Sequence, residues 1–263
     1  MGACSTPSAP PPVVGPATAP VIRAITVPTS RVEAATDVTI TATVEDAETP
    51  LTQLVYQWSA SAGTITGTGA TAIWRMPAGI TAGVNVSITL TVVDTYDAVV
   101  NNQVVKQQFV VAVTSASFRV HDSAAEMKEL ARKFLIDLFG NSSVPVEACL
   151  VDFTELGRCA EGKRLERVDI TRHREEYVII SARIERQSTR FFGPDEGEVR
   201  SISRFTDRYI PTGFVGDFCG DFVLTTVYAQ GRWWLCESTL DRSYTPTCAN
   251  SSGMSRIWGS RGY

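Results

Sequence analysis

The sequence predicts two folded units of different class: an all-β sandwich followed by an α+β domain, in which one main helix packs on a curved antiparallel sheet. Three observations support this prediction. The chain has 263 residues, which suggests two units at about 150 residues per domain. Residues 21–115 contain short alternating stretches separated by turn residues. Residues 116–250 open with a helical pattern and continue with strand-like stretches.

The first 20 residues are predicted to be a spacer. Seven of the thirteen prolines lie within the first 28 residues, and such a segment buries too little apolar surface to fold. The small residues before Cys4 and the Ser/Pro/Ala stretch after it resemble the mature start of a bacterial lipoprotein. That resemblance implies acyl chains on Cys4, a membrane contact through this lipid anchor, and a place in the extracytoplasmic bacterial cell envelope, in the periplasm or at the cell surface.

The amino terminus departs from the lipoprotein pattern, because the charged and apolar regions that should precede Cys4 are absent. Two alternatives stay open. Gly2 to Thr6 also fits the myristoylation pattern, with Cys4 available for palmitate. The terminus can also be uninformative.

Residues 21–115 are predicted to form about seven short strands. The stretches 38–44 and 86–92 alternate apolar and polar residues, so each buries one face, and 104–113 closes the unit. Trp74 with Pro77 and three segments resemble the immunoglobulin-like and PKD-type modules of bacterial surface proteins; the segments are Tyr56-Gln57-Trp58-Ser59, Gly63-Thr64-Ile65 and Leu90-Thr91-Val92-Val93-Asp94. The resemblance departs from the PKD signature over residues 58–63, and it implies spacing or adhesion without chemistry.

Residues 116–250 are predicted to hold one main helix and several strands. Ser123 and Glu126 form a capping box, and Gly140 provides the stop. The apolar positions between them share one helical face: Met127, Leu130, Phe134, Leu135, Leu138 and Phe139. The predicted strands are 165–171, 177–184, 199–209, 222–229 and 232–237. This element order, closed by Gly231 to Glu237, is similar to cystatin-like and NTF2-like domains, which implies a pocket between helix and sheet. Residues 251–263 are predicted to be a tail.

The body cysteines suggest disulfides and therefore an oxidising compartment. Five cysteines allow fifteen ways to form two bridges, and sequence alone does not choose among them. We favour Cys149 with Cys159 and Cys219 with Cys248, which leaves Cys236 as a buried free thiol. No Cys-x-x-Cys spacing occurs, so we expect no metal site.

His173 is the candidate catalytic residue, with Asp169 as the carboxylate that would orient it as a general base. On a strand these two side chains share one face, which is more simply a solvated face. Phosphate loops and nucleophile elbows are absent, so we expect no catalysis and no cofactor.

The functional prediction follows from these patterns. The 24 basic and 28 acidic residues leave a net charge of -4, whereas a nucleic-acid-binding protein normally needs a concentrated basic surface, so we expect no nucleic-acid partner. We expect a membrane-anchored, non-catalytic accessory or scaffold whose partner is a protein of the cell envelope. The alternative is a ligand-binding or enzymatic NTF2-like domain.

Overall fold

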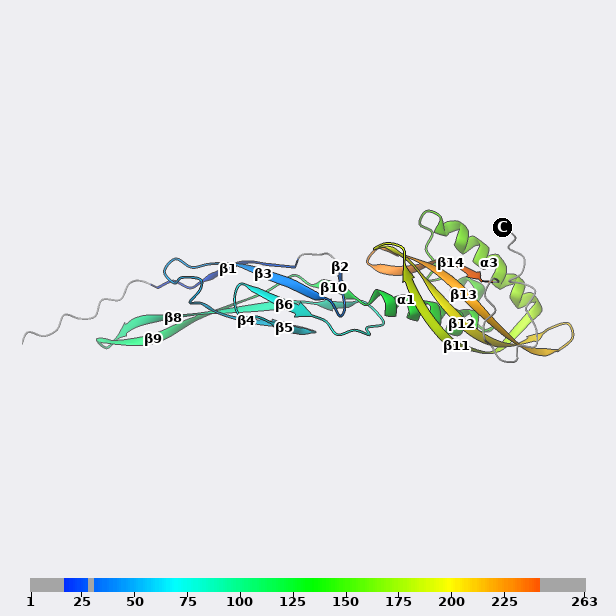
Figure 1. Cartoon of the computed structure of the whole chain (residues 1–263), viewed down its shortest axis with the longest axis horizontal. Helices are drawn as coiled ribbons and strands as arrows, with labels where there is room; N and C mark the ends of the chain where they lie inside the picture. The colour runs from blue at the N-terminus through cyan, green and yellow to red at the C-terminus, as the bar shows by residue number, and fades with distance from the viewer. Residues whose placement is uncertain (1–16, 28–30, 242–263) are drawn as a thin grey trace, which may run out of the picture. The chain divides into compact units, whose positions relative to one another are not determined.

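The computed structural model describes residues 17–27 and 31–241 (Figure 1). The chain divides into two compact units. Within the described residues, the first unit runs to Ala78 and continues over Val84–His121, and the second comprises Gly79–Gly83 and the chain from Asp122 onward. The strand Phe118–His121 belongs to the first unit, although the sequence placed it after the boundary at residue 115.

The described part of the first unit consists of strands in three sheets. The strands are β1 Val21–Thr26, β2 Arg31–Glu33, β3 Asp37–Glu45, β4 Val55–Ala60, β5 Thr64–Thr66, β6 Thr71–Arg75, β7 Val84–Val86, β8 Ile88–Val100, β9 Gln103–Thr114 and β10 Phe118–His121. One sheet has the order β1-β3-β6-β5 and another the order β4-β8-β9. In the third sheet, β10 pairs in parallel with β2 and antiparallel with β7.

Period-two alternation builds the core between the two larger sheets. Ile22 and Val44 come from one sheet, and Tyr56, Leu90 and Val92 come from the other. All five are buried, while their neighbours along each strand are more exposed. Burial of such a side chain stabilises the fold by roughly 1.5–3 kcal/mol.

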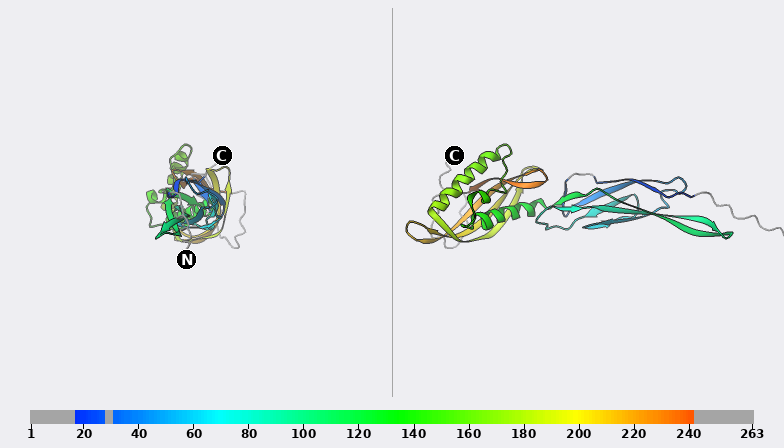
Figure 2. Two further views of the ribbon diagram at one scale, coloured as in Figure 1. Left: turned by 90° about the vertical axis from the view of Figure 1, so that its left-hand side faces the viewer. Right: turned by 180° about the vertical axis from the view of Figure 1, so that it is seen from behind.

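The second unit combines helices with one long sheet. Its helical segments are α1 Ser123–Arg132, the π-helix η1 Lys133–Phe139, α2 Val146–Cys149 and α3 Cys159–Glu176. Its strands are β11 Tyr177–Phe191, β12 Glu196–Tyr209, β13 Val215–Ala229 and β14 Arg232–Leu240, antiparallel in the order β11-β12-β13-β14. Helices α1 and α3 cover the same face of this sheet, as the right-hand view of Figure 2 shows.

The predicted fold class, an immunoglobulin-like sandwich followed by an α+β domain with one main helix, is wrong. The described residues are mostly strand and form four sheets, whereas the prediction implies three. The third sheet of the first unit joins β2, β7 and β10, which are distant in sequence and only three or four residues long. Helix α3 is also longer than α1, so the second unit has no single main helix.

Helix α3 occupies the stretch 165–171 that was predicted to be a strand. Its buried positions are spaced three or four residues apart, as a helix requires: Cys159, Gly162, Glu166, Ile170 and His173. Only two of these residues are apolar side chains, so the sequence pattern did not reveal the helical period. Val168, which the strand interpretation grouped with Ile170, is exposed.

The predicted helix from Ser123 to Gly140 forms as α1 followed by η1. Its cap differs, because Asp122 rather than Ser123 accepts the hydrogen bond from the amide of Ala125. Ser123 lies inside the helix, where its hydroxyl accepts a hydrogen bond from Trp233 Nε1 at 2.8 Å. Gly140 ends the π-helical segment with its amide on the Leu135 carbonyl.

Candidate functional site

His173 lies on α3 inside the second unit, rather than on a strand face. The side chain is buried, and its ring centroid is 5.2 Å from both Phe139 and Tyr177. Its Nε2 atom lies 3.9 Å from Asp207 Oδ2, and its Nδ1 atom has no hydrogen-bond partner. The carboxylate beside His173 is therefore that of Asp207, and the predicted Asp169 lies one turn earlier on α3.

Burial shifts the pKa of both His173 and Asp207. Desolvation, helped by Arg174, lowers the pKa of His173 to about 4. Desolvation and the nearby Asp217 raise the pKa of Asp207 to about 6, against a backbone hydrogen bond that lowers it. At neutral pH the imidazole is therefore uncharged, and its contact with Asp207 is not an ion pair. The aromatic rings around His173 leave it in the position of a core residue.

Sequence reasoning missed the polar row to which Asp207 belongs. Ser201, Ser203 and Asp207 lie at alternate positions of β12 and point to the helix-covered face, where all three are buried. The hydroxyls of Ser201 and Ser203 are 3.3 Å apart. Alternation with the arginines of the same strand could have indicated this row, because each arginine marks the opposite face.

Arg174 connects α3 to the segment that follows η1. Its guanidinium donates to the carbonyl oxygens of Val144, Leu138 and Asn141. It also donates to Cys149 Sγ at 3.3 Å. Burial raises the pKa of the Cys149 thiol, which Arg174 offsets in part, so this cysteine is a buried structural thiol.

The predicted bridge between Cys149 and Cys159 is wrong. Cys159 is bonded to Cys236, and Cys149 is free. The reason is tertiary: α3 begins at Cys159 and packs against β14, which carries Cys236. The general expectation that the chain forms a disulfide is confirmed. Cys4 and the second predicted bridge, Cys219 with Cys248, depend on positions outside the described residues.

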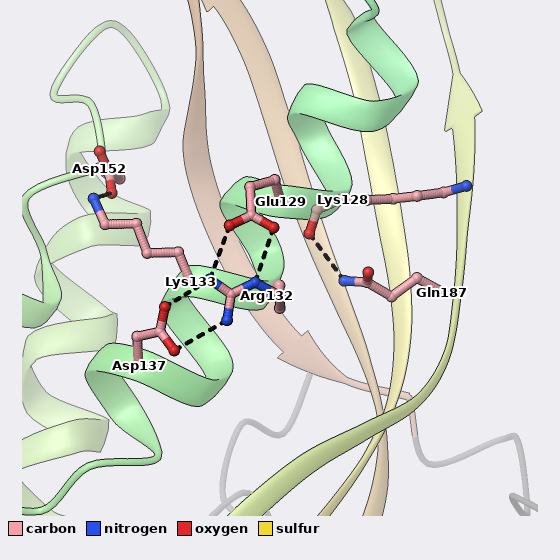
Figure 3. Close-up of polar contacts among 7 residues, drawn as sticks. All are labelled: Lys128, Glu129, Arg132, Lys133, Asp137, Asp152 and Gln187. Carbon is pink, nitrogen blue, oxygen red and sulfur yellow. Dashed lines mark hydrogen bonds and ion pairs between the residues drawn. The ribbon is translucent and has the colours of Figure 1, made fainter. Parts of the chain in front are cut away.

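A group of charged residues ties α1 and η1 to their neighbours (Figure 3). Arg132 donates two hydrogen bonds to Glu129 and two to Asp137, at 2.7–3.0 Å. Lys133 Nζ lies 2.6 Å from Asp152 Oδ2, and Asp152 is buried. Asp152 also accepts a hydrogen bond from Arg232 at 2.8 Å, so the charges form a network in which Arg132 and Asp152 each hold two partners, and its role is structural.

The β8–β9 hairpin of the first unit presents a different kind of surface. Strand β4 pairs with β8 only as far as Val93, and beyond that point β8 pairs with β9 alone within the described residues. At the tip, Asn101 and Asn102 adopt φ of 51° and 64°, as a two-residue type I′ turn requires. Four valines at this tip are 36–48% exposed: Val99, Val100, Val104 and Val105. We call this set the valine tip.

Contacts across the hairpin hold its shape behind the valine tip. Tyr96 stacks on Phe109 with centroids 4.5 Å apart, and its hydroxyl donates to Gln107. Lys106 Nζ lies 2.6 Å from Asp97 Oδ1. Val99 and Val104 are register partners on one face of the ribbon, and Val100 and Val105 lie on the other, so the tip carries apolar side chains on both faces.

Among the described residues, no group of three or more histidine, cysteine or acidic side chains could hold a metal ion. Over the same residues, no helix is long and apolar enough to cross a bilayer.

No protein-family model and no curated protein matches this chain. Among solved structures, a calcium/calmodulin-dependent protein kinase II association domain from Xanthomonas campestris is similar at 12% identity and a TM-score of 0.25. It covers 31% of this chain, which spans 58% of that structure's length. An NTF2-like protein involved in plasmid conjugation is similar at 9% identity and a TM-score of 0.28, over 71% of this chain and 78% of the other. One neighbour thus carries the NTF2-like name, but scores at this level carry no argument about function.

Proposed function

We propose that this protein is a non-catalytic protein-binding accessory of the bacterial cell envelope, held at the membrane through acyl chains on Cys4. The observation that carries the proposal is the valine tip of the β8–β9 hairpin. Apolar side chains exposed on both faces of a projecting ribbon end offer a surface that a partner can cover.

Within the described residues, no third strand pairs with the hairpin beyond Val93. A two-stranded ribbon is marginally stable at best in water. The four partly exposed valines at its end leave apolar surface in contact with water. Burying that surface on a partner would stabilise the complex by roughly 25 cal/mol per Å². A docked protein would remove this surface from water.

The location rests on two independent arguments. A disulfide such as Cys159–Cys236 persists in oxidising compartments. The lipoprotein-like start at Cys4 adds the anchor. Intact-mass analysis of protein expressed with a lipoprotein signal tests the anchor directly: we expect acylation at Cys4, and an unmodified cysteine contradicts it.

The test of the binding function replaces all four tip valines with threonine. Threonine keeps the β-branched shape and the strand propensity while making the surface polar. Val110→Thr is the matched control, because Val110 is 65% exposed on the same hairpin. A photo-crosslinker at position 103, which lies at the tip but is not one of the four valines, should capture a discrete partner in cells of the native host, from the wild type and from the control. Loss of that product in the tip variant is expected; equal capture by the tip variant rejects the proposal.

One observation favours a second candidate, a small-ligand-binding or enzymatic role for the second unit. Perturbed titratable groups such as His173 and Asp207 cluster at functional sites as well as in structural networks. A His173→Phe variant separates the candidates. Unchanged crosslinking from the hairpin together with lost ligand binding would favour the second candidate.

A further inference from the structure

A cavity of about 790 Å³ lies in the first unit. It is lined by residues of β3, of the β3–β4 loop and β4, and of the β5–β6 loop. Three successive residues of β3 line the cavity, Ala42 to Val44. Three more, Leu54 to Tyr56, line it at the start of β4, the first of them directly before the strand. Successive side chains of a strand point to opposite faces, so a space that meets three in a row lies beside the strand's edge.

Both of these strand edges lack a neighbour within the described residues. Strand β6 pairs with β3 from Asp37 to Thr41, and the amide of Ala42 makes the last bond, to the Ala70 carbonyl. Strand β3 continues beyond this point to Glu45. Strand β4 is the outer strand of the sheet β4-β8-β9. Unpaired strand edges present backbone N–H and C=O groups that an added strand can satisfy.

The chemistry of the lining selects the side chains of an occupant. None of the residues around the cavity carries a charge. Leu51 and Val55 are 46% and 50% exposed at its rim, while Leu54 and Tyr56 are buried. A charged side chain would lose its hydration here without gaining a partner, so the lining favours an uncharged occupant.

We propose that this groove between the edges of β3 and β4 binds an extended, uncharged, β-branched segment of a partner protein, which adds to the sheet as a strand. The inference rests on the proposed protein-binding function and names the chemistry of the partner segment. The free stretch of β3, Ala42 to Glu45, matches a segment of roughly four residues at about 3.3 Å per residue.

The backbone edges argue for a peptide over a small apolar molecule, because only a peptide supplies donors and acceptors at the strand repeat. The chain's own first 16 residues suit the edge poorly. They include Pro7, Pro10, Pro11, Pro12 and Pro16, and proline has no N–H to give to a ladder.

The test uses the full chain and a fluorescent peptide with alternating Thr and Val, blocked at both ends. We expect saturable binding by fluorescence anisotropy, with NMR shift changes concentrated at residues 42–44 and 54–56. The same peptide with alternate backbone nitrogens methylated should not bind, because it cannot complete the ladder.

Val55→Lys places a charge at the rim, where the side chain is already half exposed, and should weaken binding by about tenfold or more. Val110→Lys is the matched control on the hairpin and should bind like the wild type. Equal binding to Val55→Lys, undiminished binding of the methylated peptide, or shifts away from the groove each overturn the inference. So does a dimer that forms without peptide and is broken by Val55→Lys, because the occupant is then a second copy of the chain.

The two proposals fail separately. The variant with four threonines at the valine tip should bind the peptide normally. If peptide binding is absent while crosslinking from position 103 persists, the groove inference is wrong and the binding function stands. If crosslinking is absent while the peptide binds at the groove, the valine tip is not the partner surface.

Discussion

His173 Nε2 and Asp207 Oδ2 lie 3.9 Å apart in the interior of the second unit, on α3 and β12. Both groups are buried, and each is shifted toward its uncharged form. The pair therefore joins helix to sheet as neutral groups near pH 5, with opposite consequences when the pH changes.

The two residues should give opposing pH dependences of stability. The unfolded chain protonates His173 below about 6.5, whereas the folded protein does so only near 4, so this contribution is present above 6.5 and is lost as the pH falls. Asp207 has a folded pKa of about 6 and an ordinary value of 3.8, so its contribution is present below 3.8 and is lost as the pH rises through 6. Each is on the order of 3 kcal/mol.

Single variants should reveal the separate pH dependence of stability that each residue contributes. Relative to the wild type, Asp207→Asn should lose stability as the pH falls from 6 to 4, and His173→Phe should gain it as the pH falls from 6.5 to 4. Urea unfolding across this pH range measures the differences. Parallel curves for all three proteins would show that neither pKa is shifted.

The Cys159–Cys236 bridge should make a large contribution to the redox dependence of stability. It closes a loop with a sequence separation of 77, and a bridge over such a span contributes about 4 kcal/mol in the chain-entropy description. The double variant Cys159→Ala/Cys236→Ala should lose most of this free energy of unfolding. Non-reducing peptide mapping should link these two cysteines, and Cys149 should react with a thiol reagent only after unfolding. A Cys149–Cys159 peptide would contradict this assignment.

Gly162 should not tolerate a side chain. A Cβ atom there would collide with the carbonyl oxygen of Cys236, because α3 approaches the β14 backbone at this point. Gly162→Ala gains about 1 kcal/mol in helix propensity but should lose roughly 2–3 kcal/mol overall through the forced displacement. Gly193→Ala is the control, since nothing lies within 4 Å of its Cβ position. Thermal unfolding of both variants measures the effect. A lowered Tm for Gly162→Ala alone indicates crowding against β14, whereas an unchanged or raised Tm contradicts it.

Arg132 should contribute through its two carboxylate partners, Glu129 and Asp137 (Figure 3). These side chains are 39–46% exposed, so solvent screens them and the group should be worth about 1 kcal/mol or less. Arg132→Lys should lose most of that, because lysine lacks the planar fork. The loss should shrink in high salt. Lys128→Met is the control and should leave stability unchanged, because Lys128 forms no ion pair with any of the described residues.

Local patterns predicted parts of the structure well. Alternation located β3 and β8, and the apolar spacing after Ser123 located α1 and η1. Local patterns failed at α3, where the buried face includes Gly162, Glu166 and His173 and so has no apolar period. Gly162 is buried there only because β14, far along the chain, packs directly against it.

The candidate site shows the same division. His173 could be named from the sequence as a titratable group of interest, but its neighbour Asp207 could not, since the two lie on elements that meet only through tertiary packing.

The amino-acid sequence by itself determined which stretches have strand or helix periodicity, the proline-rich start and the near balance of charge, because these depend on residues close together in the chain. The tertiary structure alone decided the strand pairing, the choice of Cys236 as the partner of Cys159, and the burial of His173 beside Asp207. Those features depend on contacts between distant segments, and no local pattern records which distant surface a given residue will meet.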